Sequence, residues 1–503
     1  MTIELRWLEA IARANGRRRH GMALGLGLLS GLALPPVHAI PVLLVAVPGL
    51  LALIGGRGVR AAAIMGFWFG FGHHLIGLYW ITDAILFEAD RFWWLVPLAV
   101  PALSAVLAVF IAVPCAVAWR ARPGWPRALA LAGGWVLADL ARQFVLSGFP
   151  WNPWGSVWAV PGLVGDVALQ PAALISVHGL TLITILLAAT PALGRRAMAA
   201  GALVLALWAG VGVWRLSWPV GPDPHVSVVL VQGNVEQGRR YDRAYALEIF
   251  DRHLDLTREG VAKAGAGTAV VVWPETVSPF RVATDAAARA AIVDAANVTA
   301  LIGSVRIDED GRARNSLVAL QGPGRPAAIY DKAHLVPFGE YTPGWMPLPI
   351  QLVPGAGFAP GPGPASLHLP GLPAVGPLIC YESIFPAGVV DERDRPAWMV
   401  NVTNDAWFGN SAGPRQHLVA ARLRAVEEGL PLMRAANSGI TAGFDAFGRE
   451  LGRLGIGQTG VLVLALPGTL PPTLFARLGL VVPLALAGAA LAMGLAAQRS
   501  KPA

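Results

Sequence analysis

Three reactive side chains stand where apolar runs end in this sequence: Glu275 ends VVVWPE, Lys332 ends AIYDK and Cys380 ends GPLIC. A cysteine thiol is a potential nucleophile, but it needs a base or a nearby cation to become a thiolate at neutral pH. A glutamate can act as the base, and a lysine can supply the cation. Ligands of open α/β sheets bind beyond the carboxyl ends of the strands, so these three groups are candidates to converge at one site.

Each of the three residues also has a structural interpretation when it is taken alone. Glu275 fits a solvated or capping carboxylate, and Cys380 fits a small buried side chain that is chemically inert. Lys332 fits an ordinary surface cation, yet only three of the 39 basic residues are lysines. A site that requires a compact ammonium in place of a planar guanidinium explains that choice.

The segments that must position these residues predict a layered α/β domain between about residues 223 and 465. Helical periodicity is present at 242–263, 284–297 and 414–428. Short strand-like runs lie before, between and after these helices. Such alternation favours an α/β fold. The seven runs are HVSVVLVQGNV, AVVVWPE, ALIGSVRI, NSLVAL, AAIYDK, AVGPLICYE and WMVNVTND.

The rest of the chain has the composition of a membrane protein. Its 503 residues have a mean hydropathy of +0.54 and only 14% charged residues. Apolar runs of about 20 residues predict spanning helices. We predict a membrane domain with seven spans at 1–220, a catalytic domain at 221–467 and a last span with a tail at 468–503. The eight expected spans are 21–37, 39–56, 59–81, 92–119, 127–147, 172–191, 196–215 and 474–496.

The arginines predict the orientation, because positive charge is retained in cytoplasmic loops. Arginines precede the first span and follow spans two, four and six, whereas the alternate loops are poor in cations. We therefore expect both termini in the cytoplasm and the catalytic domain outside it. The basic start followed by VHA also fits a cleavable signal peptide, which would leave this orientation unchanged. The net charge of +8 reflects the cytoplasmic loops and does not indicate a nucleic-acid surface.

The catalytic segment resembles the nitrilase superfamily in VQGNV, VWPET, YDKAHLVPFGEY, ICYESIFP, NVTNDAWFG, PRQHL and RAANSGIT. With the eight spans and FPWNPWG in an outer loop, the whole chain resembles the apolipoprotein N-acyltransferase family. The resemblance implies a multi-pass α-helical membrane domain plus an extracytoplasmic αββα sandwich in the bacterial inner membrane. It also implies that a phospholipid acylates the cysteine, after which the acyl chain passes to the amino group of a diacylglyceryl apolipoprotein.

The resemblance assigns roles to the candidate residues. Glu275 is expected to act as the base and Cys380 as the nucleophile. Lys332, with the backbone N–H after the cysteine, is expected to stabilise the oxyanion. Further residues are expected near the site, with structural roles as alternatives: Glu340 and Glu382 as carboxylates that orient Lys332 and the triad, Tyr381 beside the thiol, and Asn315. Tyr241 stands where the family usually has tryptophan.

The Pro- and Gly-rich segment 341–373 suggests an apolar lid that admits lipid tails, since loops this long are uncommon unless they are functional. Its candidate lid residues are Trp345, Met346 and Leu348, and an ordinary packed loop is the alternative. Trp151, in an outer loop, is a candidate for substrate entry, although an interfacial aromatic belt also explains it.

No zinc spacing, phosphate-binding loop or nucleotide motif is found, so we expect no metal, no cofactor and no nucleic acid. The expected partners are a phospholipid acyl donor, an apolipoprotein acceptor and the lipid bilayer. A membrane-anchored amidase is the main alternative, because the superfamily shares the triad. A transporter or scaffold with an inactive domain is a third possibility, against which the intact triad argues. Asp139 and Arg142 are expected to pair inside the helical bundle.

Overall fold

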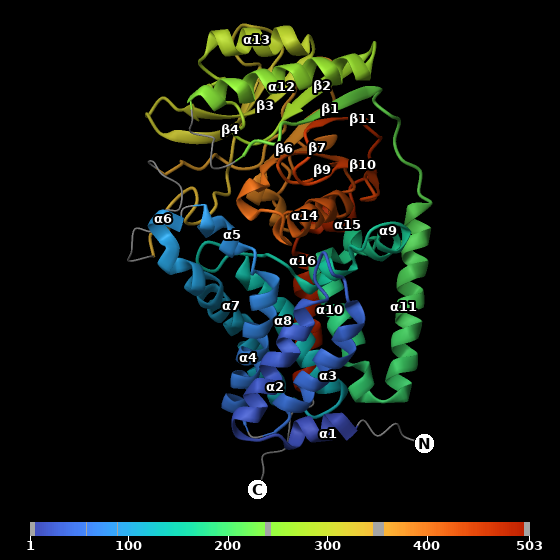
Figure 1. Ribbon diagram of the computed structural model, residues 1–503. Helices are drawn as coiled ribbons and strands as arrows, with labels where there is room; N and C mark the ends of the chain where they lie inside the picture. The colour runs from blue at the N-terminus through green and yellow to red at the C-terminus, as the bar shows by residue number, and fades with distance from the viewer. Residues whose placement is uncertain (1–5, 57, 88, 237–242, 346–356, 497–503) are drawn as a thin grey trace. The chain divides into compact units, whose positions relative to one another are not determined.

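The computed structural model describes residues 6–56, 58–87, 89–236, 243–345 and 357–496, with the remaining segments drawn in grey in Figure 1. The chain divides into two compact units. Unit 1 comprises Met1–Ser217 and Leu474–Ala503, and unit 2 comprises Trp218–Thr473. Because the two units are separate bodies, each is considered by itself.

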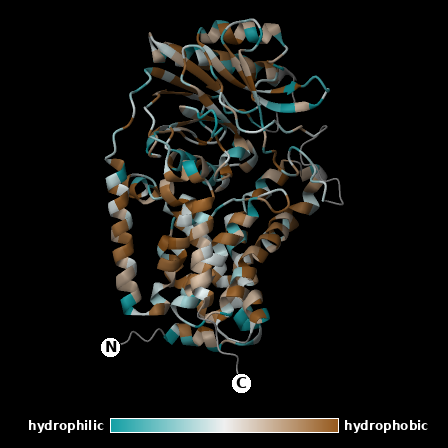
Figure 2. Cartoon of the chain, turned by 180° about the vertical axis from the view of Figure 1, so that it is seen from behind, coloured by the Kyte–Doolittle hydropathy of each residue, from teal (hydrophilic) through white to brown (hydrophobic). Residues whose placement is uncertain are grey.

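Unit 1 is helical, and each of the eight predicted spans contains an α-helix. Most residues of these helices are hydrophobic (Figure 2). In the described part of the chain, three helical segments are long and apolar enough to cross a membrane: Trp93–Trp119, Ala172–Leu193 and Arg195–Leu216. The number of spans therefore stays a prediction. The eight helices are α2 (Gly16–Gly31), α3 (Leu43–Ile54), α4 (Val59–Gly77), α7 (Val96–Trp119), α8 (Trp125–Arg142), α10 (Ala172–Leu193), α11 (Arg195–Leu216) and α16 (Val481–Ala496).

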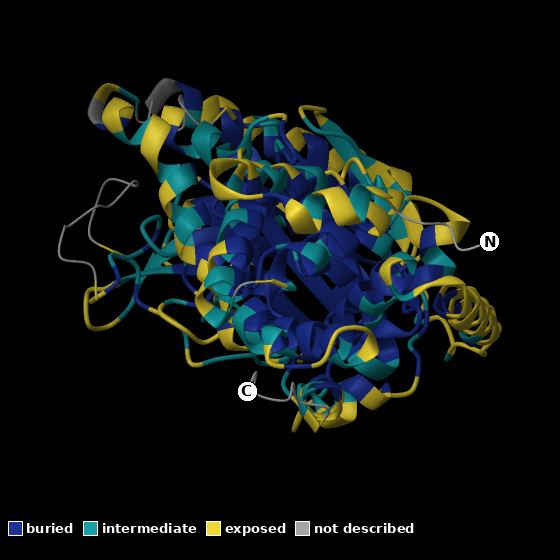
Figure 3. Cartoon of the chain, turned by 90° about the horizontal axis from the view of Figure 1, so that it is seen from below, coloured by how far each residue is buried: buried dark blue, intermediate teal, exposed yellow. Residues whose placement is uncertain are grey.

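Exposed apolar side chains lie on α3, α7, α11 and α16 in particular, as expected for surfaces that meet lipid. Helix α11 shows this most clearly, because most of its residues are exposed in the structure (Figure 3). Several buried polar residues of unit 1 have polar partners. Within α8, Arg142 lies 3.2 Å from Asp139, which confirms the predicted ion pair. His73 contacts Ser30 and Trp154, whereas His74 contacts the carbonyl of Gly70.

Unit 2 contains two β-sheets. The six-stranded sheet has the order β11-β1-β2-β3-β4-β5, and the five-stranded sheet has the order β10-β9-β8-β7-β6. In each sheet a parallel core is extended by antiparallel strands. The strands are β1 (Val226–Gln232), β2 (Thr268–Trp273), β3 (Thr299–Ile307), β4 (Ala313–Leu320), β5 (Ala328–Asp331), β6 (Val375–Ile379), β7 (Trp398–Asn404), β8 (Leu432–Asn437), β9 (Thr441–Phe444), β10 (Glu450–Leu454) and β11 (Gly460–Ala465).

The two sheets pack face to face and helices cover both outer faces, so the predicted αββα sandwich is confirmed (Figure 1). Apolar residues such as Leu230 and Val400 form the core between the sheets. Helices α12 (Arg243–Ala264) and α13 (Ala286–Ala296) pack on the six-stranded sheet, where they bury Ile249 and Ile292. Helix α14 (Gly413–Glu428) packs on the five-stranded sheet. Strands β2 and β5 belong to the six-stranded sheet and β6 belongs to the five-stranded sheet, so the residues that follow these strands come from both sheets.

Strands β8 to β11 are absent from the seven runs predicted from the sequence. Strand β11 pairs antiparallel with β1 and closes one edge of the six-stranded sheet, although it lies more than 200 residues further along the chain. Strand β8 pairs parallel with β7 and is buried along its whole length. Its sequence LMRAAN carries Arg434 in the middle, and a buried arginine breaks the apolar pattern that identifies strands.

Candidate active site

Glu275 lies two residues beyond β2 and is held by three donors. Its Oε1 atom accepts hydrogen bonds from Asn315 Nδ2 at 2.7 Å and from Lys332 Nζ at 3.1 Å. Its Oε2 atom accepts the backbone N–H of Asn404 at 2.8 Å. Because donors from both sheets fix the carboxylate, its orientation is set before any substrate arrives.

Lys332 follows β5 directly and is almost completely buried, with 1% of its side chain exposed. Its Nζ atom lies 2.9 Å from Oε2 of Glu340 in addition to its contact with Glu275. Burial lowers the pKa of Lys332, but the carboxylates of Glu275 and Glu340 outweigh this effect and raise it well above its usual value. The ammonium therefore stays charged throughout the physiological pH range.

Asn315 of β4 joins the two carboxylates that flank the ammonium. Its Nδ2 atom donates to Oε1 of Glu275 at 2.7 Å and to Oε1 of Glu340 at 2.8 Å. Both amide hydrogens are thereby used, and Glu340 also accepts the backbone N–H of Val336. Glu340, which was predicted to orient Lys332, and Asn315, which was predicted to lie near the site, are thus in direct contact with this cluster.

Cys380 directly follows β6 and begins the short 3₁₀ helix Cys380–Ile384, with a left-handed φ of +51°. A non-glycine residue in this conformation is strained, and the surrounding structure must hold it there. The thiol is buried and interacts electrostatically with both Glu275 and Lys332. All three residues predicted from the strand ends are therefore brought together.

The electrostatics of the thiol favour its neutral form at rest. Burial raises the pKa of Cys380, and the negative charges of Glu275 and Asp405 raise it further. Lys332 and a hydrogen bond from Thr403 act in the opposite direction but do not cancel these effects. At neutral pH the site therefore holds a thiol next to a carboxylate, which is the arrangement that general-base activation of the nucleophile requires.

Glu382, predicted to orient Lys332 and the triad, interacts electrostatically with Lys332 and hydrogen-bonds to the backbone beside the triad residues. Its Oε2 atom accepts the backbone N–H of Ile379 at 2.6 Å, immediately before the nucleophile. Its Oε1 atom accepts the hydroxyl of Tyr330 and the backbone N–H of Ala333, on either side of Lys332 along the chain. Glu382 therefore fixes the backbone near Cys380 and near Lys332 relative to each other.

Tyr381 is buried beside the nucleophile in the chain. Its ring stands perpendicular to that of Phe385 at a centroid distance of 5.3 Å. Phe385 in turn stacks on His334 at 4.5 Å. The three rings therefore link Tyr381, which follows the nucleophile, to His334, which lies in the loop after Lys332.

The sequence reasoning missed a second buried polar cluster, which lies behind Cys380. It consists of Asp405, His417 and Arg434, each at most 1% exposed. The quoted motifs NVTNDAWFG, PRQHL and RAANSGIT contain these three residues. The available signal was that NVTNDAWFG and RAANSGIT each carry one charged side chain, Asp405 and Arg434, and that PRQHL carries a histidine.

The lid predicted at 341–373 is too long. Residues 357–373 are packed against the sandwich: Gly361 N–H bonds to the carbonyl of Lys332, and Leu367 and Leu369 belong to the core. Trp345 is 46% exposed and its ring contacts Phe338. The other predicted lid residues, Tyr241, Met346 and Leu348, lie outside the described residues.

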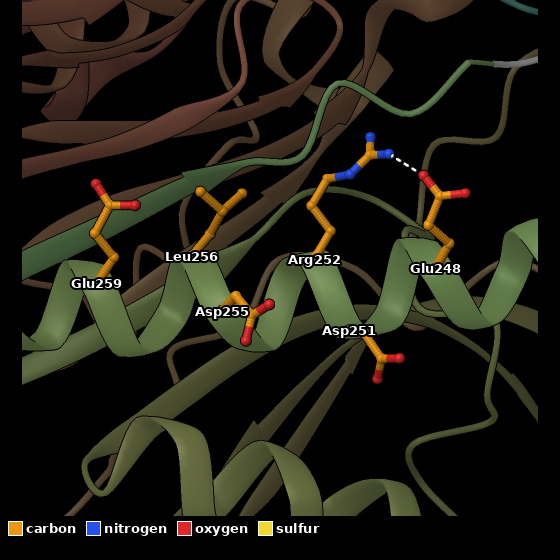
Figure 4. A pocket seen from close by; sticks show the side chains of 6 residues that line it. All are labelled: Glu248, Asp251, Arg252, Asp255, Leu256 and Glu259. Atoms are coloured by element: carbon orange, nitrogen blue, oxygen red, sulfur yellow. Dashed lines mark hydrogen bonds and ion pairs between the residues drawn. The ribbon is translucent and has the colours of Figure 1, made fainter.

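Trp151 belongs to unit 1, where it is buried. Its ring lies 4.8 Å from that of Trp80 and stacks on Phe149 at 5.9 Å. In unit 2, a depression runs along the outer face of α12, where Arg252 pairs with Glu248 at 2.6 Å (Figure 4). This depression contains none of the triad residues. Its lining residues are Glu248, Asp251, Arg252, Asp255, Leu256 and Glu259.

Comparison with known proteins supports the assignment of both parts of the chain. Residues 26–190 match the family described as "Apolipoprotein N-acyltransferase N-terminal domain", and residues 228–468 match "Carbon-nitrogen hydrolase". An apolipoprotein N-acyltransferase of Rhodopseudomonas palustris is 39% identical over 511 residues, which cover 94% of each chain. The chain belongs to the apolipoprotein N-acyltransferase family. It is therefore an acyltransferase and an integral membrane protein.

A second relative agrees with this membership. An apolipoprotein N-acyltransferase of Bradyrhizobium diazoefficiens is 38% identical over 508 residues, with 93% of each chain covered. Among solved structures, an amidase from Nesterenkonia sp. is similar over 50% of this chain and 94% of its own, with 20% identity and a TM-score of 0.37. A carbon-nitrogen hydrolase from Helicobacter pylori covers 48% of this chain and 87% of its own, with 16% identity and a TM-score of 0.37.

Proposed function

We propose that this family member transfers an acyl chain from a phospholipid, through a thioester on Cys380, to the amino group of the S-diacylglyceryl cysteine of an apolipoprotein. The reaction completes bacterial lipoprotein maturation. The observation that carries the proposal is the buried cluster in which Lys332 pairs with Glu275 and both face the Cys380 thiol. The apolar helices of unit 1, in the same chain, fit substrates that reside in a bilayer.

In the first half-reaction the Cys380 sulfur attacks the ester carbonyl of the phospholipid. Glu275 accepts the thiol proton as the carbon–sulfur bond forms, and the negative charge moves to the carbonyl oxygen. Lys332 and the backbone N–H of Tyr381 stabilise this oxyanion, and one such donor is typically worth ~3 kcal/mol. The carbon–oxygen bond then breaks, and Glu275 returns the proton to the departing alkoxide of the lysophospholipid.

In the second half-reaction the α-amino group of the apolipoprotein attacks the thioester. Glu275 accepts one proton from the amine, the oxyanion forms again beside Lys332, and the carbon–sulfur bond breaks. The departing thiolate takes the proton back from Glu275, so the enzyme returns to its starting state. A thioester suits this sequence because a thiolate leaves readily, and transfer in place of hydrolysis requires that water be kept out.

We also propose how the chain crosses the membrane and on which side its domains lie. Residues 1–220 form a membrane domain with seven spans, 221–467 form a catalytic domain in the periplasm, and 468–503 form the eighth span with a cytoplasmic tail. This arrangement rests on the arginine-rich loops, which are retained in the cytoplasm. Both termini are then cytoplasmic, and the protein resides in the bacterial inner membrane.

Access of the lipid chain is proposed to involve a shorter lid than the sequence suggested. It comprises Trp345 with the following segment, which carries Met346 and Leu348. The exposed ring of Trp345 supports this part of the proposal, since an apolar side chain that reaches outward is suited to contact acyl chains. Tyr241 and Trp151 are proposed as further contacts on the route of the substrates.

The experiment that tests the function is intact-protein mass spectrometry of the detergent-purified chain after incubation with phosphatidylethanolamine. We expect a hydroxylamine-sensitive acyl adduct on the wild type and none on Cys380→Ala. A lipopeptide with an S-diacylglyceryl N-terminal cysteine should then remove the adduct and gain one acyl chain. If phospholipid leaves the wild type unmodified while small amides are hydrolysed, the chain is a membrane-anchored amidase and the proposal fails.

A further inference from the structure

The backbone of the nucleophile is held from behind by His417 of α14. The Nε2 atom of His417 lies 3.0 Å from the carbonyl oxygen of Cys380. Ser383 donates its hydroxyl to the same oxygen at 3.0 Å and lies 3.1 Å from the imidazole. This carbonyl belongs to the residue with the left-handed φ of +51°, so the contacts act where the backbone is strained.

Thr403, which lies on β7 and is completely buried, interacts with the thiol of the nucleophile. This interaction lowers the pKa of the thiol. The Oγ1 atom of Thr403 also donates to Oδ1 of Asp405 at 3.1 Å. A threonine hydroxyl can both donate and accept hydrogen bonds, so it suits a neighbour that ionises during the reaction.

Both contacts lead to the same carboxylate. Oδ1 of Asp405 also lies 2.8 Å from Nδ1 of His417, and Oδ2 accepts a hydrogen bond from Arg434 at 2.6 Å. Burial raises the pKa of Asp405, but the positive charges of Arg434 and His417 outweigh it and lower the pKa to about 2. Asp405 therefore remains an anion and acts by accepting hydrogen bonds and not by taking up a proton.

We propose that Asp405 positions Cys380 at both ends, through His417 at the carbonyl and through Thr403 at the sulfur. Thr403 is in this view a further positioning residue, and its hydroxyl favours the thiolate form of the nucleophile. Asp405 and His417 are positioning residues that act through Thr403 and the backbone. The inference rests on the proposed role of Cys380 as the nucleophile and extends the active site beyond the triad.

The first test measures the rate at which iodoacetamide alkylates Cys380 in the full-length chain that carries Cys115→Ala, so that Cys380 is the only thiol. Below the thiol pKa this rate follows the thiolate fraction. We expect Thr403→Val to lower the alkylation rate about tenfold between pH 7 and 9, which corresponds to one unit of pKa. Thr403→Ser retains the hydroxyl and should restore the rate. Glu275, Lys332 and Asp405 are the charged groups that face the thiol, and they are unchanged in both variants.

Thr257→Val is the matched control for Thr403→Val. Thr257 is also completely buried in unit 2, and its hydroxyl accepts a hydrogen bond from Trp273 at 2.8 Å, but it does not contact the nucleophile. This control should alkylate at the wild-type rate. Equal rates for Thr403→Val and wild type would overturn the role of Thr403, as would an equal loss in Thr257→Val.

The second test addresses His417. We expect His417→Leu to lower the kcat of thioester formation by at least tenfold with little change in KM, whereas His417→Gln, which can still donate to the carbonyl, should recover part of the rate. His253→Gln serves as the control, since His253 is equally buried but bonds only to its own helix at Ile249. A rise in KM without a change in kcat, or equal losses in the His417 and His253 variants, would refute the positioning role.

The two proposals fail in distinguishable ways. If Cys380→Ala retains thioester formation or acyl transfer, the proposed nucleophile is wrong and this inference falls with it. If Cys380→Ala is inactive while the Thr403 and His417 variants behave like wild type, the proposed function stands and only the present inference is refuted. Where His417→Leu does not fold, the alkylation rates of the Thr403 variants decide.

Discussion

The Nζ atom of Lys332 lies 3.1 Å from the Oε1 atom of Glu275, although 57 residues separate them in the chain. The two residues follow different strands of the six-stranded sheet, so this distance is a product of the fold. It places the cation next to the base that must later carry a proton. An ammonium in this position stabilises both the carboxylate in the resting state and the oxyanion during the reaction.

Replacing Lys332 by Met should lower the rate of thioester formation by a factor of about 10² to 10³, the usual cost of losing one oxyanion donor. The change also leaves the carboxylates of Glu275 and Glu340 without their shared cation. Intact-mass measurement of acyl adduct against time gives the rate. Lys263→Met is the matched control, because Lys263 forms an exposed ion pair with Glu259, and it should be neutral. A Lys332→Met rate within threefold of wild type would contradict the role.

Replacing Asn315 by Asp should lower the rate of thioester formation. Asn315 donates one amide hydrogen each to Glu275 and Glu340, so the aspartate removes both hydrogen bonds and repels its two neighbours. The base is then held less firmly in place, and we expect a loss of about tenfold at pH 7. Asn297→Asp, at an exposed helix end, controls for the added charge. A wild-type rate in Asn315→Asp would count against this explanation.

Replacing Cys380 by Ser should make unit 2 relatively more stable in alkali. Burial raises the pKa of the thiol in the folded chain, so the unfolded chain releases this proton first as pH rises. The stabilising contribution is complete below the unfolded pKa of about 8.5 and is lost as pH rises toward the folded value. The wild type should therefore lose up to about 1.4 kcal/mol per pH unit more than the serine variant between pH 9 and 10. Thermal unfolding midpoints of the two chains at pH 7, 9 and 10 measure the difference, and parallel curves would refute it.

Replacing Trp345 by Ser should slow acylation by long-chain phospholipids more than acylation by a short-chain, water-soluble ester. The ring is 46% exposed and apolar, so its loss weakens contact with a lipid chain without disturbing the triad. We expect a several-fold increase in KM for the long-chain donor, and a larger one when Leu348 is replaced as well. Leu451→Ser, which removes an exposed apolar side chain from β10, is the control. Unchanged kinetics with both donors would exclude the lid.

The triad was predictable because each member follows an apolar strand, and the fold brings strand ends together. Asn315 and Glu340 were found through family resemblance. In the structure Glu340 contacts the ammonium of Lys332, and Asn315 joins Glu340 to Glu275. The cluster behind the nucleophile was not predictable in this way. Arg434 lies in the middle of β8, where a charged side chain predicts an exposed position. Its contacts with Asp405, Asn401 and the carbonyl of Ile440 compensate for its burial.

The missed strands have a related explanation. Strands β10 and β11 are partly exposed, and β10 contains charged residues and a glycine, so neither shows a clean alternation of apolar and polar residues. Strand β10 is positioned by pairing with β9, and β11 by pairing with β1. The pairing of β11 with β1 joins two segments far apart in the chain, which a local sequence pattern does not connect. The packed part of the supposed lid was missed for the opposite reason: its Pro and Gly content resembles a mobile loop, whereas Leu367 and Leu369 anchor it in the core.

Within the helices of unit 1, replacing Arg142 by Met should destabilise the protein by about 3–5 kcal/mol, because it leaves Asp139 buried without its partner. Arg142 lies 3.2 Å from Asp139, and both side chains are less than 10% exposed. The double variant Asp139→Asn with Arg142→Met removes both charges and should recover most of that loss. Thermal unfolding in detergent measures the stabilities, and Asp139→Asn alone completes the cycle. A double variant as unstable as Arg142→Met would show that the arginine stabilises the unit through packing and not through its charge.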